Sequence, residues 1–100
     1  MSTVIVQYKV HPSSVEENER LIRAVYTQLA ELNPAGFRYT TSKLDDGQTF
    51  VHFAILDEGA TNPLATLSAF KDFQSGIKDR CIEPPVARNG APVGSYGIEI

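Results

Sequence analysis

His52 is the residue of this sequence best suited to chemistry, because it lies in the middle of the otherwise apolar segment Thr49–Leu56. An imidazole titrates near neutral pH, so it can act as a catalytic base or orient a phenolic or carbonyl ligand. The commoner alternative is a buried or interface histidine whose hydrogen bonds are satisfied by a neighbour. The other histidine, His11, precedes Pro12 in a predicted turn, and we expect it at the surface.

Several other side chains could form the walls of a ligand site. Arg38, Thr40 and Ser42 share one face of a predicted strand and could donate hydrogen bonds, although an edge strand more often presents such residues to solvent. An aromatic stripe such as Phe70 and Phe73 on a predicted helix is usually part of the core. The candidate ligand-binding residues are Gln7, Arg38, Phe50, Leu56, Phe70 and Phe73.

The tyrosines and the single cysteine are weaker candidates. Tyr8, Tyr39 and Tyr96 could stack on an aromatic compound, but core and interface packing is the commoner use of tyrosine. Cys81 follows Arg80, whose charge could lower the thiol pKa. The sequence has no paired-cysteine metal spacing, no glycine-rich phosphate loop and no nucleophile-elbow motif, so metal, nucleotide and serine-hydrolase sites are not expected.

The composition is typical of one soluble globular domain covering residues 1–100. Hydrophobic residues make up 42% and charged residues 21%, and the net charge of -3 offers no basic surface for nucleic acid. A lone cysteine excludes an intrachain disulfide, the start lacks the pattern of a signal peptide, and no apolar run approaches the ~18 residues of a membrane helix. We therefore expect a cytoplasmic protein with no nucleic-acid or membrane partner.

The hydrophobic pattern predicts the order strand, helix, strand, strand, helix, strand. A capping box is expected at the first helix, with Ser13 or Ser14 as the cap and Glu16 or Glu17 three residues later. Asp45–Gln48 predicts a tight turn between two antiparallel strands. The expected strands are Thr3–Val10, Phe37–Leu44, Thr49–Leu56 and Val93–Ile100, and the helical regions run from Ser13 or Ser14 to Leu32 and from Asn62 to Ile82, with Gly76 as a candidate break.

This order predicts an α+β, ferredoxin-like βαββαβ fold, with a four-stranded antiparallel sheet and helices on one face. The segment Thr49–Leu56 is apolar on both faces, so its second face must line a cavity or meet a partner. We expect the helix-covered face to carry Val4, Val6, Tyr8, Val51, Phe53 and Ile55. The open face would then carry Ile5, Gln7, Lys9, Phe50, His52, Ala54 and Leu56. A face this apolar predicts a homodimer.

Three stretches resemble the dimeric α+β barrel superfamily, most closely its antibiotic biosynthesis monooxygenase-like domain. They are VIVQYKVHP before an acidic helix start, NPAGFRYTTSKLDDGQTFVHFAILDEGA, and LSAFKDFQSGI. The resemblance covers nearly the whole chain. It implies a homodimer of ferredoxin-like subunits packed sheet to sheet, each with a pocket between its sheet and its helices or loops.

The resemblance implies less about activity. Cofactor-independent, quinone-forming members carry an Asn four residues before a Trp on the third strand, and those places are occupied here by His52 and Leu56. Haem-degrading relatives need an axial histidine in the second helical region, and Asn62–Ile82 contains none, so no cofactor is expected. The expected function is a monooxygenase-like enzyme acting on an aromatic or polyketide-like molecule, with His52 as base or positioning group. The alternative is a noncatalytic small-ligand-binding, stress-response or accessory dimer.

Overall fold

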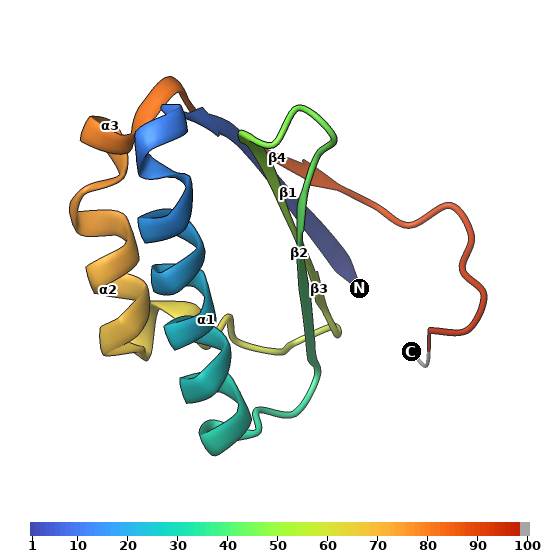
Figure 1. Ribbon diagram of the computed structural model, residues 1–100. Coiled ribbons are helices and arrows are strands. Elements are labelled where there is room, and N and C mark those ends of the chain that lie inside the picture. Colours follow the sequence, from blue (N-terminus) through green and yellow to red (C-terminus); the bar gives the residue numbers. More distant parts are fainter. Residues whose placement is uncertain (99–100) are drawn as a thin grey trace.

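The computed structural model describes residues 1–98, with a four-stranded antiparallel sheet whose one face is covered by helices (Figure 1). Strand β3 lies inside the sheet, in the order β2-β3-β1-β4. The strands are β1 (Ser2–Val10), β2 (Phe37–Lys43), β3 (Thr49–Leu56) and β4 (Cys81–Gly90). The helices are α1 (Val15–Leu32), α2 (Ser68–Ser75) and α3 (Ile77–Arg80), with short 3-10 turns η1 (Pro12–Ser14) and η2 (Leu64–Thr66). The predicted fold class is confirmed.

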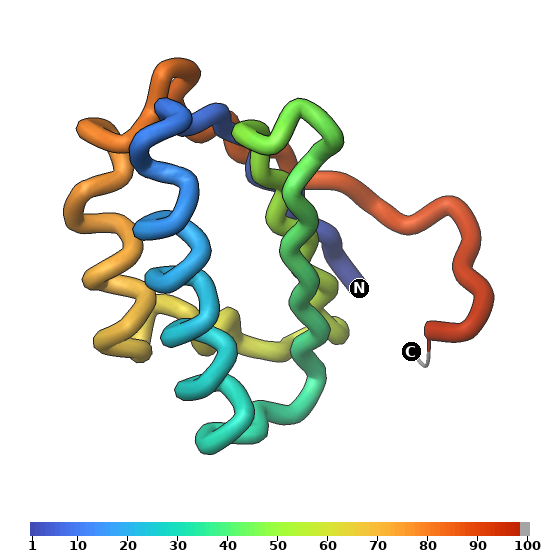
Figure 2. The backbone as a smooth tube through the Cα atoms, viewed as in Figure 1, coloured from blue at the N-terminus to red at the C-terminus, as the bar shows by residue number. Residues whose placement is uncertain are grey.

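Helix α1 lies on the sheet beside α2 (Figures 1 and 2). Its buried residues are Asn18, Leu21, Ile22 and Val25, which recur at helical spacing. Glu16 and Glu17 lie in the first turn, where the helix dipole favours negative charge. The predicted capping box is wrong, because the Ser14 side chain makes no capping hydrogen bond and the Ser14 N–H donates to the His11 carbonyl at 2.9 Å instead of to a glutamate.

The second helical region divides at Gly76, as the sequence predicted. Asn62 accepts a hydrogen bond from the Leu64 backbone N–H at 3.0 Å and so shapes the turn that leads to α2. Leu67, the cap position of α2, has no side chain that can accept a hydrogen bond. Gln28 of α1 accepts instead from the Ala69 N–H at 2.9 Å, so a side chain from another helix satisfies the start of α2.

The predicted assignment of the two faces of β3 is wrong. Tyr8 pairs with Phe50 and Val6 with His52, and directly opposed residues of antiparallel strands share a face. The helix-covered face therefore carries Val4, Val6, Tyr8, Val10, Phe50, His52, Ala54 and Leu56. The open face carries Ile5, Gln7, Lys9, Val51, Phe53 and Ile55. Because β3 is apolar on both faces, its own alternation could not reveal the register, and a slip of one residue exchanges the faces.

The predicted final strand, Val93–Ile100, is also wrong. The fourth strand is β4, and residues 91–98 form no strand, while residues 99–100 lie outside the described part of the chain. Pro84 and Pro85, which follow the predicted helical region Asn62–Ile82, lie within β4. The pairing of β1 with β4 shifts between Gln7 and Lys9, opposite these prolines, and an edge strand with such an irregularity tolerates residues that lack an N–H donor.

Candidate functional site

A cavity of about 270 Å³ lies between the sheet and α2. Each sheet strand around it contributes through residues on the helix-covered face, and α2 contributes its inward aromatic side chains. Six of the residues that line it are Tyr8, Tyr39, His52, Phe70, Phe73 and Gln74. The site is therefore mainly apolar and aromatic, with a small number of polar groups, which is the usual character of a small-molecule site.

His52 is the central polar group of this cavity and is only 5% exposed. Its Nε2 lies 2.8 Å from Tyr8 Oη, and its Nδ1 lies 2.6 Å from Tyr39 Oη. Thr41 Oγ1 is also near Nδ1, at 3.1 Å, and pairs with Tyr26 Oη at 2.8 Å. Nε2 thus has a hydroxyl partner on β1, and Nδ1 has two hydroxyl partners on β2.

Two buried side chains extend this hydrogen bonding away from the cavity. Asn18 Nδ2 donates to Tyr8 Oη at 3.0 Å, and Arg80 Nε donates to Asn18 Oδ1 at 3.1 Å. Arg80 also donates to the Phe73 carbonyl at 2.6 Å, and its guanidinium lies over the Phe73 ring, 5.3 Å from the centroid. We call the series Arg80, Asn18, Tyr8, His52 and Tyr39 the polar chain.

Aromatic rings surround His52 on the helix side. The His52 ring centroid is 5.5 Å from that of Phe73, and the Phe73 centroid is 6.1 Å from that of Phe70. Tyr8 stacks on the His52 ring at 5.4 Å. A flat, apolar ligand would therefore meet ring faces and edges on this side of the cavity.

Burial keeps the cavity residues uncharged. Desolvation lowers the pKa of His52 to about 4, so its imidazole is neutral at physiological pH. Desolvation also raises the pKa of Tyr8 and of Tyr39 well above the ordinary value for tyrosine, so both hydroxyls keep their protons. The cavity can thus share hydrogen bonds with an oxygen-bearing ligand without a formal charge on these three residues.

Of the seven site residues predicted from sequence, three line this cavity together: His52, Phe70 and Phe73. The other four lie elsewhere: Arg38 pairs with Asp57 at 3.0 Å, and Phe50 stacks on Tyr8 at 5.7 Å within the core. Leu56 is buried at the end of β3, outside the cavity lining. Gln7 lies on the open face.

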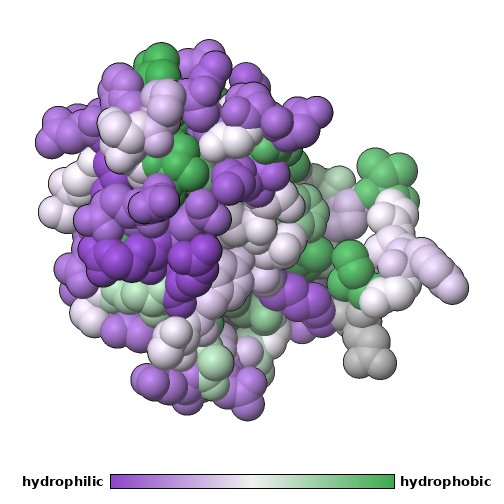
Figure 3. Space-filling model, in the orientation of Figure 1, coloured by the Kyte–Doolittle hydropathy of each residue, from purple (hydrophilic) through white to green (hydrophobic). Residues whose placement is uncertain are grey.

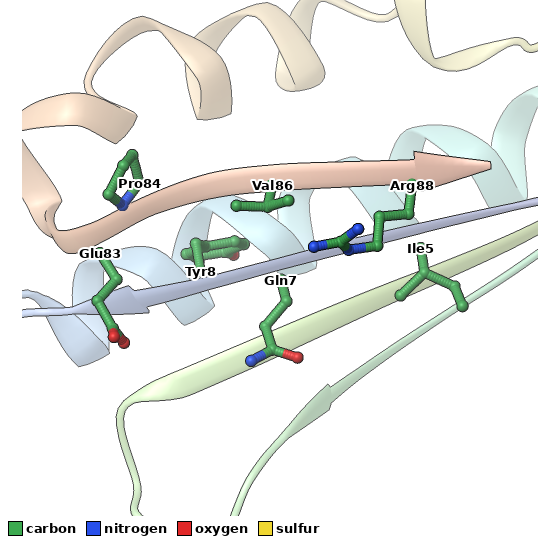
Figure 4. A pocket seen from close by; sticks show the side chains of 7 residues that line it. All are labelled: Ile5, Gln7, Tyr8, Glu83, Pro84, Val86 and Arg88. Atoms are coloured by element: carbon green, nitrogen blue, oxygen red, sulfur yellow. The ribbon is translucent and has the colours of Figure 1, made fainter.

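Gln7 belongs to a second, solvent-open cleft of about 330 Å³ on the open face (Figure 4). It lies beside Val86 of β4, its antiparallel partner, and the same cleft includes Arg88, the partner of Ile5. Ile5 and Val86 are 38% and 50% exposed there. These exposed apolar side chains make the cleft a candidate contact surface. It is separate from the His52 cavity, which lies on the other face of the sheet.

Sequence reasoning missed Asn18 and Arg80. Asn18 stands one turn before Leu21 and Ile22 on the buried stripe of α1, so a polar residue at a core position was the available signal. Arg80 gave no such signal, because its burial depends on how α3 folds back against α1 and β4. Tyr96, considered beside Tyr8 and Tyr39, is fully exposed. His11 is exposed, as predicted.

The predicted lowering of the Cys81 thiol pKa is wrong. Burial raises the pKa of Cys81, and the opposing effect of the Arg80 charge is smaller. Within residues 1–98 no cluster of three histidine, cysteine or acidic side chains is placed to hold a metal ion. The same residues include no helix that is both long and apolar enough to span a membrane.

No family model matches the sequence, and no curated protein is significantly similar to it. The fold is nevertheless similar to several solved structures. Rv0793 from Mycobacterium tuberculosis superposes with a TM-score of 0.76 at 17% identity, covering 96% of this chain and 98% of that protein. A crystal structure of an antibiotic biosynthesis monooxygenase gives a TM-score of 0.76 at 15% identity, covering 94% of this chain and 100% of the other.

A variant of SnoaB, a cofactor-independent oxygenase from Streptomyces nogalater, gives a TM-score of 0.70 at 15% identity, covering 97% of each chain. At such identities the likeness establishes the fold alone. The chain has the ferredoxin-like α+β fold of antibiotic biosynthesis monooxygenase-like proteins, as the resemblance predicted.

Proposed function

We propose that the protein is a homodimeric, cofactor-independent monooxygenase-like enzyme that acts on an aromatic or polyketide-like small molecule bound in the cavity between the sheet and α2. The observation that carries this proposal is the position of His52, which faces the cavity between two tyrosine hydroxyls. Similarity of fold to an oxygenase described as cofactor-independent supports the same class of chemistry.

Without a cofactor, the substrate itself must supply the two electrons that reduce the second oxygen atom of O₂ to water. In the oxidation of an anthrone by O₂, one oxygen atom becomes the new ring carbonyl, and the other leaves as water with the two hydrogens of the oxidised carbon. The protein's part is to bind the flat rings against Phe70 and Phe73 and to hold the substrate oxygen near His52. His52 is the positioning group, or the base that takes up the substrate proton.

An oxygen-uptake assay tests this proposal. Purified protein without added metal or flavin is supplied with anthrone and with phenolic compounds, and we expect uptake by the wild type and a loss of at least about 100-fold in His52→Phe, the lower range for a general acid–base group. His11→Phe, which changes the exposed histidine, should retain full activity. Absence of uptake with every compound, or equal uptake by His52→Phe, would contradict the proposal.

A noncatalytic small-ligand-binding, stress-response or accessory role is the second candidate. A specific observation favours it: both nitrogens of His52 are already paired, and its low pKa makes it a weak base. The Asn and Trp of the quinone-forming members are also missing, since His52 and Leu56 stand in their places. Saturable binding of an aromatic compound without oxygen uptake would favour this second candidate.

The open face of the sheet supports the homodimer. Ile5 and Val86 are substantially exposed there, and Val93 and Tyr96 of the C-terminal segment are fully exposed. Figure 2 shows this segment leaving the sheet, and Figure 3 shows hydrophobic side chains on that side, with mainly hydrophilic ones over the helices. A second copy would cover this apolar surface. We also propose a cytoplasmic location, with which the free Cys81 is compatible.

A further inference from the structure

We propose that Arg80 and Asn18 act as positioning residues that fix the direction of every hydrogen bond in the polar chain, so that Tyr39 presents its hydroxyl proton to the cavity. The site would then select a flat aromatic compound that carries a carbonyl oxygen. The ligand part of this inference rests on the proposed function, whereas the direction of the hydrogen bonds does not.

The argument begins at Arg80, because a guanidinium can only donate hydrogen bonds. Its Nε lies 3.1 Å from the Asn18 side chain, so the Asn18 atom facing it must be the carbonyl oxygen. The amide nitrogen of Asn18 then faces Tyr8 Oη at 3.0 Å, and an amide nitrogen can only donate. Arg80 thus determines that Tyr8 accepts a hydrogen bond from Asn18.

Tyr8 passes the direction on to His52. Since Tyr8 Oη accepts from Asn18, its own proton is available for His52 Nε2, which lies 2.8 Å away. If His52 Nε2 carried the proton instead, both Nε2 and Asn18 would donate to Tyr8 Oη. The buried Tyr8 proton would then have no acceptor among the hydrogen-bond partners of Tyr8 in the described chain. Buried donors are rarely left unpaired, so Nε2 is the acceptor.

A neutral imidazole carries one proton, which must then be on Nδ1. The closest partner of Nδ1 is Tyr39 Oη at 2.6 Å, whereas Thr41 is farther, at 3.1 Å, and is paired with Tyr26. Tyr39 Oη therefore accepts from His52. Thr41 Oγ1 also lies beside Tyr39 Oη, but it already pairs with Tyr26 and His52, so a ligand oxygen in the cavity that Tyr39 lines can take the Tyr39 proton.

The Tyr39 hydroxyl proton defines the ligand chemistry. A carbonyl oxygen would accept this proton, while the attached rings would lie against Phe70 and Phe73. A hydrocarbon of the same shape would offer the Tyr39 proton no acceptor, so it would gain no hydrogen bond in this site. The polar chain therefore acts on specificity through residues that do not themselves touch the ligand, namely Arg80 and Asn18.

Nitrogen-15 NMR of histidine-labelled protein tests the direction of the chain without any ligand. The chemical shifts of the two ring nitrogens report which one carries the proton. We expect the Nδ1–H tautomer for His52 in the wild type. In Asn18→Asp the carboxylate accepts from both Arg80 and Tyr8, so the Tyr8 proton turns away from His52. The two shifts should then exchange as His52 becomes the Nε2–H tautomer.

An Nε2–H tautomer in the wild type would overturn the inference, as would an unchanged Nδ1–H tautomer in folded Asn18→Asp. If Asn18→Asp fails to fold, the wild-type measurement alone still decides which ring nitrogen of His52 carries the proton. Tyr39→Phe is the matched control, because Thr41 can still accept from Nδ1 and the tautomer should stay Nδ1–H.

Ligand selection is tested with α-tetralone and tetralin, which differ in one carbonyl group. The wild type should bind the ketone about threefold to tenfold more tightly, the range of a single neutral hydrogen bond, and Tyr39→Phe should lose this preference. Equal binding of both compounds by the wild type would overturn the selection. If neither compound binds, the ligand part fails together with the proposed function, while the NMR result still decides the direction of the chain.

Discussion

His52 illustrates how burial decides the chemistry of a residue. The same imidazole at a surface would be charged or neutral depending on small changes in pH, but here it lies between Tyr8 and Tyr39 with a pKa lowered to about 4. Because the folded protein binds this proton less readily than the unfolded chain, protonation of His52 is linked to unfolding.

The sign of this linkage gives the first prediction. Between pH 6.5 and pH 4 the unfolded chain carries the His52 proton and the folded protein does not, so the free energy of unfolding falls as the pH falls through this window. At about 1.4 kcal/mol per pKa unit, the loss attributable to His52 approaches about 3 kcal/mol. Urea unfolding at pH 7 and at pH 4.5 should show a smaller loss for His52→Gln than for the wild type.

His11→Gln is the control for this experiment, since His11 is exposed, and it should lose as much stability as the wild type. Equal acid sensitivity of the wild type and His52→Gln would show that His52 titrates normally in the folded protein.

Among single residues of the site, the sequence was informative about His52, Phe70 and Phe73. An imidazole in an apolar strand is visible without a structure, and so are aromatic residues at helical spacing such as Phe70 and Phe73. Asn18 was visible only as a polar residue on the apolar stripe of α1, and its hydrogen bond to Arg80, 62 positions along the chain, is part of no local pattern.

Helix α2 forms one wall of the cavity, and its position depends on Gln28 of α1. The Gln28 side chain donates to Ser68 Oγ at 2.8 Å and accepts from the Ala69 N–H at 2.9 Å. These two bonds join the helices at the end of α2 that has no cap of its own. The aromatic side chains of α2 are therefore placed partly by a residue of another helix.

We expect Gln28→Ala to reduce the free energy of unfolding by about 1–2 kcal/mol, because both hydrogen bonds are lost. Amide hydrogen exchange should become faster in the first turn of α2. Gln28→Glu keeps an acceptor for the Ala69 N–H and places negative charge at the positive end of α2, so it should lose less than half as much. Equal losses in the two variants would contradict this role for Gln28.

Gly36 determines how the chain enters β2, the strand of Tyr39. Its φ of +72° favours glycine, and an added Cβ would lie 3.2 Å from Ala60 Cβ. We expect Gly36→Ala to reduce the free energy of unfolding by about 2 kcal/mol, from backbone strain together with crowding. Gly47→Ala is the matched control: its φ is also +72°, but an added Cβ would meet no atom within 4 Å beyond its chain neighbours in residues 1–98, so thermal unfolding should show a loss of only about 1 kcal/mol.

If Gly36→Ala and Gly47→Ala are equally destabilised, the close approach at Gly36 has no energetic effect.

The element order and the bounds of β3 were predictable because each follows from local periodicity and turn residues. The face of β3 that meets the helices was not predictable, because Phe50 and Phe53 are equally suited to burial. The extent of β4 was hidden by Pro84 and Pro85, which an edge strand accommodates.

For the whole molecule, the sheet has one face covered by helices and one face without such cover. The corrected register leaves the proposed homodimer with a different contact surface, made by Ile5, Gln7, Val51, Phe53 and Val86. His52 lies on the opposite face of the sheet. A dimer would therefore stabilise the sheet beneath the cavity without placing His52 in the interface.

Light scattering tests this assembly. We expect the wild type to be a dimer at micromolar concentration and Ile5→Lys to be a folded monomer, because the ammonium group would be buried in an apolar contact. Leu32→Lys changes an exposed leucine at the end of α1 and should leave the dimer intact. A monomeric wild type, or a dimeric Ile5→Lys, would contradict the proposed interface.

The central claim is that an aromatic ligand binds in the cavity beside His52, and an NMR titration of histidine-labelled protein with α-tetralone tests it most directly. The sequence contains two histidines, so exposed His11 is an internal control in the same sample. We predict saturable shifts of the His52 resonances while those of His11 stay constant. Unchanged His52 resonances up to the solubility limit of the ligand, or equal shifts of both histidines, would contradict the claim.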